Sequence, residues 1–153
     1  MEGVDNIMND GLKLKNIVKW EKFDKDGNLV ESGVHENQVQ TLVKERVIDA
    51  LETGSLTSPI TAMAIGTGSG VGVSGTGLAS KASNEDLSSQ TQPTGTSLEN
   101  VASFTGVSGT ITEAGLFDAS GCTDDMYFYD DGLSVTLTSS DTLQITWTIN
   151  CTG

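Results

Sequence analysis

The chain has 153 residues, a length that suits one domain with a hydrophobic core of its own. Its 21 acidic and 8 basic residues give a formal net charge of −13, which repels a phosphate backbone, so we expect no nucleic-acid partner. No stretch approaches the roughly 20 apolar residues of a membrane-spanning helix, so we expect no membrane partner. The acidic start lacks the pattern of a secretion signal, which predicts synthesis in the cytoplasm.

The first ten residues are rich in Asn and Asp and hold few apolar anchors. This composition predicts a flexible arm over 1–10, ahead of one domain over 11–153. A strand follows the arm, with a bulge or bend expected near 16–22, where the alternation breaks. The strand is indicated by apolar residues that share one phase: Leu12, Leu14, Val18 and Trp20.

A hairpin turn is predicted at 24–28, because Asp26 and Gly27 lie between two apolar runs. The returning strand is expected over 29–34. Next, an amphipathic helix is predicted over about 37–53, from apolar residues spaced at i, i+3 and i+4. Asn37 suits its N-cap, Gln40 the reciprocal capping position and Gly54 its C-terminal end. A single helix of this kind normally covers one face or end of a sheet.

A short apolar strand is predicted over 60–65, and a compositionally biased region over 66–97 comes after it. Gly, Ser and Thr supply 19 of those 32 residues (7, 7 and 5). We interpret the region as long loops around one or two short strands, one of them near 78–81. Its segment 70–75 matches the G-x-G-x-x-G pattern, but no helix start follows it, which argues against a dinucleotide site.

From residue 98 onward, strands and turns alternate. In the last strand, Leu143, Ile145, Trp147 and Ile149 point one way and polar residues point the other, which indicates one buried and one wet face. The pattern predicts a mainly β fold, an antiparallel sandwich or jelly roll with one amphipathic helix. The strands are expected over 99–106, 110–118, 126–129, 133–138 and 142–151.

The two cysteines, Cys122 and Cys151, do not have zinc-ligand spacing. Cytoplasmic synthesis favours free thiols, but a disulfide between them remains open, and it would contribute about 3–4 kcal/mol.

We expect no catalytic residue, no cofactor and no metal site, and therefore no enzyme. His35, the single histidine, has no nucleophile motif beside it. Acidic residues around 126–129 could meet at a hard cation, although solvated turn acids are the simpler interpretation. They are Asp124, Asp125, Asp130 and Asp131.

Strand 126–129 is apolar on both faces, so it is either central or at an interface, and we expect an interface. Glu113, the one charge in its strand, either pairs with a base at a subunit contact or lies on the wet face. The residues that we expect at interfaces are Leu12, Leu14, Glu113, Tyr127 and Tyr129.

Segments 111–118 (ITEAGLFD) and 141–149 (DTLQITWTI) resemble the C-terminal signature of small virion structural proteins of tailed bacteriophages. Further landmarks keep the order of that family. They are a hairpin with DKDGN at 24–28, an N-x-V segment at 37–39, a strand ending in GTG at 66–68, and VASFT at 101–105.

The resemblance implies a capsid decoration, or cement, protein that stabilises the head. It further implies a homotrimer bound to the major capsid protein on the outer capsid surface of the virion, assembled in the host cytoplasm. The alternative is a tail-associated or fibre-base protein with a host-receptor or glycan-binding role.

Overall fold

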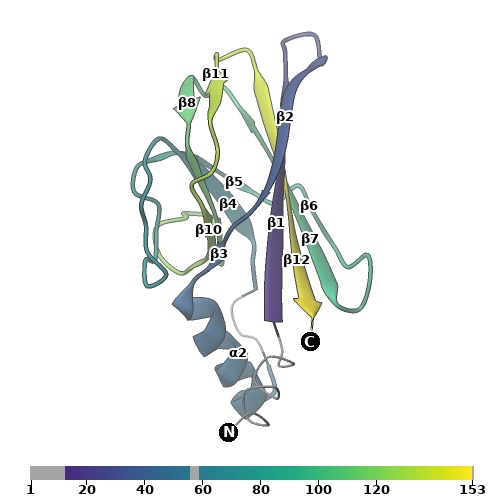
Figure 1. The fold of residues 1–153 in the computed structure, drawn as a ribbon, viewed down its shortest axis with the longest axis vertical. Helices are drawn as coiled ribbons and strands as arrows, with labels where there is room; N and C mark the ends of the chain where they lie inside the picture. The colour runs from purple at the N-terminus through teal and green to yellow at the C-terminus, as the bar shows by residue number, and fades with distance from the viewer. Residues whose placement is uncertain (1–12, 56–58, 153) are drawn as a thin grey trace, which may run out of the picture.

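The computed structural model describes residues 13–55 and 59–152 (Figure 1). The arm predicted over 1–10 and the expected interface residue Leu12 lie outside the described residues. In the described part of the chain, no helix is long and apolar enough to cross a membrane.

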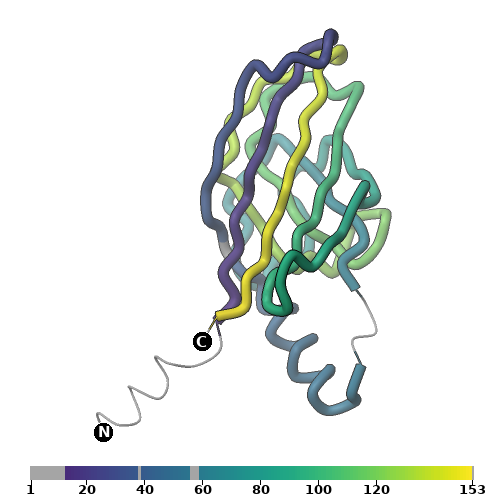
Figure 2. Tube along the Cα trace, turned by 90° about the vertical axis from the view of Figure 1, so that its right-hand side faces the viewer, coloured from purple at the N-terminus to yellow at the C-terminus, as the bar shows by residue number. Residues whose placement is uncertain are grey.

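Two antiparallel five-stranded sheets face each other in a sandwich-like fold, with one helix at its end (Figures 1 and 2). The mainly β prediction is therefore confirmed. The first sheet has the order β2-β1-β12-β7-β6 and the second β3-β10-β9-β4-β5. The first comprises β1 (Lys13–Phe23), β2 (Leu29–Glu36), β6 (Ser89–Thr91), β7 (Ser97–Thr105) and β12 (Thr142–Thr152). The second comprises β3 (Gln38–Val39), β4 (Ala62–Gly66), β5 (Lys81–Asp86), β9 (Glu113–Phe117) and β10 (Met126–Asp130).

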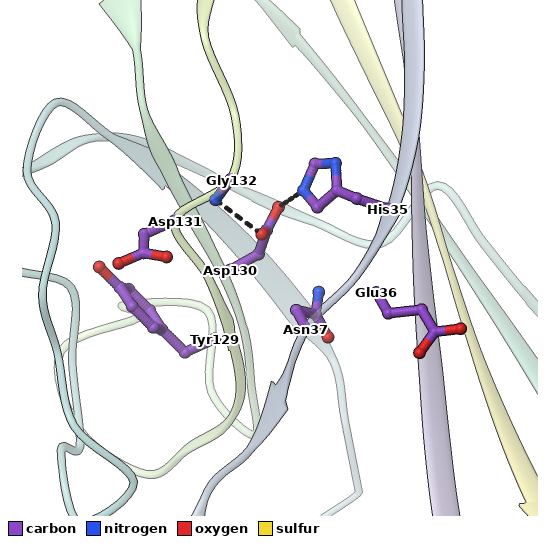
Figure 3. A pocket seen from close by; sticks show the side chains of 7 residues that line it. All are labelled: His35, Glu36, Asn37, Tyr129, Asp130, Asp131 and Gly132. Atoms are coloured by element: carbon purple, nitrogen blue, oxygen red, sulfur yellow. Dashed lines mark hydrogen bonds and ion pairs between the residues drawn. The ribbon is translucent and has the colours of Figure 1, made fainter.

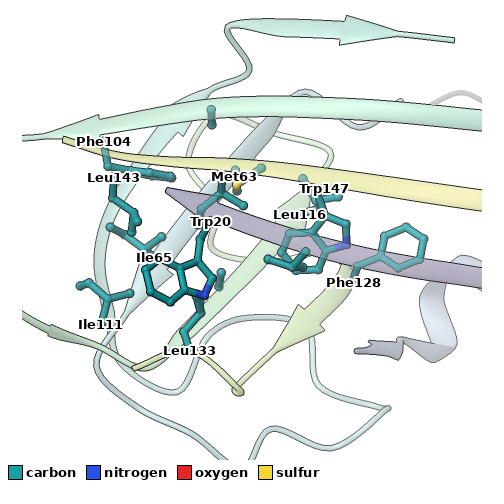
Figure 4. Close-up of a cluster of buried hydrophobic side chains, with 14 of the residues drawn as sticks. Trp20, Met63, Ile65, Phe104, Ile111, Leu116, Phe128, Leu133, Leu143 and Trp147 are labelled. Carbon is teal, nitrogen blue, oxygen red and sulfur yellow. The ribbon is translucent and has the colours of Figure 1, made fainter. Parts of the chain in front are cut away.

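The last strand, β12, occupies the middle of the first sheet and pairs with β1 and β7 along its length. Its predicted inward residues are buried, and the polar residues between them are only partly so, which confirms the phase. The Trp147 indole N–H donates to Asn16 Oδ1 at 2.9 Å, so the polar atom of this buried ring is satisfied. Trp20 packs in the same cluster between the two sheets (Figure 4).

The predicted hairpin between β1 and β2 is confirmed. Asp24 closes it: its Oδ1 accepts hydrogen bonds from the backbone N–H groups of Asp26 and Asn28, and Gly27 takes a positive φ of 81°. The bulge predicted near 16–22 lies at Lys22/Phe23, at the end of that range.

Helix α2 (Thr41–Thr53) begins four residues later than predicted. Residues 38 and 39 form β3 beside β10 instead, so Asn37 is not the N-cap. Gln40 occupies the N-cap position but makes no side-chain capping bond. The predicted end is confirmed, since Gly54 adopts the left-handed conformation and donates to the Ala50 carbonyl.

Of the two placements that the sequence predicted for helix α2, a face or an end of a sheet, the structure has the second (Figure 1). The helix leaves the end of the sandwich and points away from it (Figures 1 and 2). Val43 is its buried residue, whereas Ile48 and Leu51 on the outer turns are 63% and 78% exposed.

Two other predictions needed revision. The strand expected over 110–118 divides at Thr112 into β8 (Gly109–Ile111) and β9, because β8 pairs with β11 (Val135–Leu137) while β9 joins the second sheet. The strand expected near 78–81 starts at Lys81 as β5, and β6 is a second short strand in the same biased region.

Candidate functional site

Glu113 is a fully buried carboxylate at the start of β9. Its Oε1 accepts hydrogen bonds from the backbone N–H groups of Gly68 at 3.1 Å and Ser80 at 2.7 Å. Its Oε2 accepts from the N–H of Ala79 and from the Tyr129 hydroxyl, both at 3.0 Å. These bonds replace the water that burial removes. Both sequence interpretations of Glu113, a subunit ion pair and a wet-face residue, are therefore wrong.

The GTG segment and Glu113 are parts of one unit, which we call the Glu113 anchor: Gly66 to Gly68, Ala79, Ser80, Glu113 and Tyr129. The close approach requires glycine, since a Cβ on Gly66 would collide with the Ser80 carbonyl oxygen and would lie 2.5 Å from Glu113 Oε1. Gly115, two residues along β9, is closely packed against Met126 and Leu78 in the same way. Two landmarks of the phage resemblance, GTG and ITEAGLFD, thus meet in space.

The glycine-rich segment 70–77 is a loop, as predicted, but it is fastened at both ends. Gln40 Nε2 donates to the carbonyl oxygens of Gly72 at 2.8 Å and Gly75 at 2.9 Å. Asp131 Oδ2 accepts from the backbone N–H of Gly70 at 3.1 Å. Sequence reasoning missed these contacts because Gln40 fitted a capping position equally well. The sequence did hold one indication of these contacts. The backbone N–H and C=O groups of a glycine-rich segment need hydrogen-bond partners wherever the segment is buried, and a nearby polar side chain such as that of Gln40 can supply them.

Strand β10 is central, not an interface. It lies between β3 and β9, and Tyr127 and Tyr129 are only 3% and 2% exposed. Burial raises the pKa of both phenols, and for Tyr129 the hydrogen bond to Glu113 acts in the same direction. The expectation that these tyrosines face a partner is thus corrected: a strand that is apolar on both sides is here a strand with both faces covered.

A polar pocket of about 260 Å³ lies where the chain crosses from β2 to β3 (Figure 3). On its wall, His35 Nε2 lies 2.5 Å from Asp130 Oδ2, and the Gly132 N–H donates to Asp130 Oδ1 at 2.9 Å. Burial raises the pKa of Asp130, and the bonds from Gly132 and His35 oppose that shift. The pair joins β2 of one sheet to β10 of the other.

Three of the four acids considered for a cation site have separate partners. Asp130 pairs with His35, Asp131 holds Gly70, and Asp125 lies 3.9 Å from Arg46 Nη2. Within residues 13–55 and 59–152, no three potential ligands come together in a way that could hold a metal ion.

An apolar groove of about 300 Å³ separates α2 from the start of β1. Leu14, one of the expected interface residues, forms part of its wall, and the exposed side chain of Ile48 lies at its outer edge. We call this groove, together with exposed Leu51, the α2 surface. Its groove is lined by Leu14, Val39, Lys44, Val47 and Ile48.

Both cysteines are free thiols, which closes the alternative of a disulfide. Cys122 is buried beside Ala119, and burial raises the pKa of its thiol to about 11. Cys151 lies near the end of β12 and is partly exposed.

No protein-family model matches this chain, and a comparison with curated proteins finds no match either.

Proposed function

We propose that this protein is a structural component of a tailed-phage virion, a capsid decoration protein that binds the outside of the head and stabilises the shell. The observation that carries the proposal is the position of the resembling segments. GTG and ITEAGLFD interlock through the Glu113 anchor, and DTLQITWTI forms the central strand β12. The resemblance therefore rests on residues that determine this fold together, rather than on unrelated short matches.

The α2 surface is the proposed contact with the major capsid protein. Its helix extends beyond the end of the sandwich (Figure 1). The side chains of Ile48 and Leu51 on this helix are exposed to water. Burying such side chains against a shell stabilises the bound state by about 1.5–3 kcal/mol each. A protein that binds only the assembled shell shifts the equilibrium toward that shell by mass action.

The proposed partners are further copies of this chain in a homotrimer and the major capsid protein, at the outer capsid surface. The acidic balance of the chain keeps such a shell soluble when many copies lie close together.

The test uses phage heads that lack this protein. These heads should package DNA yet rupture more readily on heating or osmotic shock, and purified protein should restore resistance with saturation at a fixed number of copies per head. Ile48→Asp and Leu51→Asp should abolish the rescue. Val73→Asp is the matched control, because Val73 is also an exposed aliphatic residue but lies on the glycine-rich loop. Rescue that survives both helix substitutions would remove the α2 surface from the proposal.

The alternative, a tail-associated or fibre-base protein with a receptor-binding or glycan-binding role, predicts a different outcome. Heads without the protein would then be normally stable while the particles fail to adsorb to cells. Copy number per particle separates the two roles, since head decoration requires hundreds of copies and a tail position a dozen or fewer.

A further inference from the structure

Strand β2 is the edge of the first sheet, where β1 is its one partner among the described strands (Figure 2). Natural edge strands usually carry Lys or Pro, a mid-strand bulge or a covering segment that blocks pairing with another chain. β2 has neither Lys nor Pro, and its bulge lies near the turn, beyond the regular stretch 31–36. Val34, in that regular stretch, is 65% exposed, and Leu29 and Val30 are exposed as well.

The β1–β2 hairpin also lacks the acidic excess of the chain as a whole. Residues 13–36 contain five lysines and five acidic residues, a net charge of zero, so the whole formal charge of −13 lies elsewhere. β2 itself carries two acids: Glu36 is paired with Lys15 at 2.9 Å, and Glu31 lies opposite Lys22 of β1. Because lysines of β1 lie beside both acids of β2, a second acidic copy meets little local repulsion at this edge, and a basic segment gains no particular attraction to it.

We propose that two copies of this chain associate through their β2 edges, in antiparallel pairing about a twofold axis. The pairing joins two five-stranded sheets into one continuous ten-stranded sheet. It goes beyond the proposed function, because a threefold arrangement does not supply a twofold contact.

The face of each side chain supports this geometry. Val18 is buried and lies opposite His35, so His35 points inward, and its neighbour Val34, opposite Lys19, points outward. A twofold axis perpendicular to the sheet places the inward faces of both copies on one side of the joined sheet and their outward faces on the other. With the axis near the middle of the stretch 31–36, Val34 and the partner's Val34 lie on the same face within direct or diagonal cross-strand reach.

The first experiment measures self-association by sedimentation equilibrium over a wide concentration range. Val34→Asp places a carboxylate opposite Lys19 within the monomer but brings two carboxylates together across the seam. We expect it to weaken dimerisation about tenfold or more, equivalent to about 1.4 kcal/mol. Val73→Asp, the matched control on the glycine-rich loop, should leave it unchanged. Circular dichroism and thermal melting of the diluted proteins check that both variants fold alike.

Salt and cross-linking complete the test. Two acidic copies should associate more tightly as NaCl screens their mutual repulsion, whereas binding to a basic partner would weaken. With both natural cysteines replaced by Ser, Val34→Cys should form a disulfide-linked dimer under mild oxidation and Val73→Cys should not. A monomer at all concentrations, or a dimer indifferent to Val34→Asp, overturns this proposal. A dimer indifferent to Val34→Asp leaves the proposed function unaffected. A monomer at all concentrations would also remove a homotrimer that forms in solution, while head rescue tests shell binding separately.

Discussion

The residue Glu113 illustrates how one buried carboxylate can organise a glycine-rich segment. Backbone N–H groups on the two sides of the glycine-rich segment 70–77, from Gly68 before it and from Ala79 and Ser80 after it, converge on the two oxygens of Glu113. The segment itself offers few apolar side chains to bury, so polar contacts position it instead. The landmark glycines and the landmark acid are therefore explained by a single interaction.

Replacing Glu113 tests that explanation. Glu113→Gln keeps the size of the side chain but turns an NH₂ group toward backbone donors, which leaves buried N–H groups unpaired. We expect a loss of about 3 kcal/mol in the free energy of unfolding, measured by urea titration. Tyr129→Phe, which removes a single bond to the same carboxylate, should cost about 1 kcal/mol. Equal losses in the two variants would show that the backbone contacts contribute little.

A second residue-scale prediction concerns thiol reactivity. Because the Cys122 thiol has its pKa raised to about 11, on the order of one molecule in 10⁴ holds a thiolate there at pH 7. Iodoacetamide should therefore label Cys151 well before Cys122 in the folded protein, and both at similar rates in urea. Peptide mapping by mass spectrometry distinguishes the two sites. Rapid labelling of Cys122 under native conditions would contradict its burial.

At the scale of elements, strand periodicity and turn chemistry were readable from the sequence. The alternation from Leu143 to Ile149 predicted the buried face of β12, and Asp26-Gly27 predicted the β1–β2 hairpin. The start of α2 was not readable, because Asn37 and Gln40 make a plausible cap pattern while tertiary contacts use those positions otherwise. Likewise, β10 has the same apolar pattern whether a sheet or another subunit covers it.

The central place of β12 leads to a prediction for the strand. Trp147 is fully buried between the sheets, so Trp147→Ala should cost about 3–5 kcal/mol in the free energy of unfolding. Trp147→Phe retains a ring but leaves the Asn16 Oδ1 without the indole donor, and should cost less. Chemical denaturation monitored by circular dichroism measures both. A loss below about 1 kcal/mol for the Ala variant would mean that the strand is peripheral.

At the scale of the whole molecule, the charge is unevenly distributed. Residues 13–36 have a formal net charge of zero and the remaining residues together carry the full −13, so acidic repulsion at the first hairpin is weaker than the net charge of the whole chain suggests. The proposed attachments use surfaces of different kinds, an apolar helix for the shell and a neutral sheet edge for a second copy. Separate surfaces allow both contacts to form at once.

The same charge distribution predicts how folding responds to salt. Acidic groups repel one another across the folded molecule at pH 7, and raising NaCl from 0.01 M to 0.15 M shortens the Debye length from about 30 Å to about 8 Å. The free energy of unfolding should therefore rise over this range and level off above it. Urea is the suitable denaturant because guanidinium chloride is itself a salt, and the Val34→Asp variant at low concentration keeps association out of the measurement. The exposed ion pair Lys15–Glu36 is weak enough that its screening should not reverse the trend. Stability that falls with added salt would show instead that attractive pairs dominate the electrostatics of this fold.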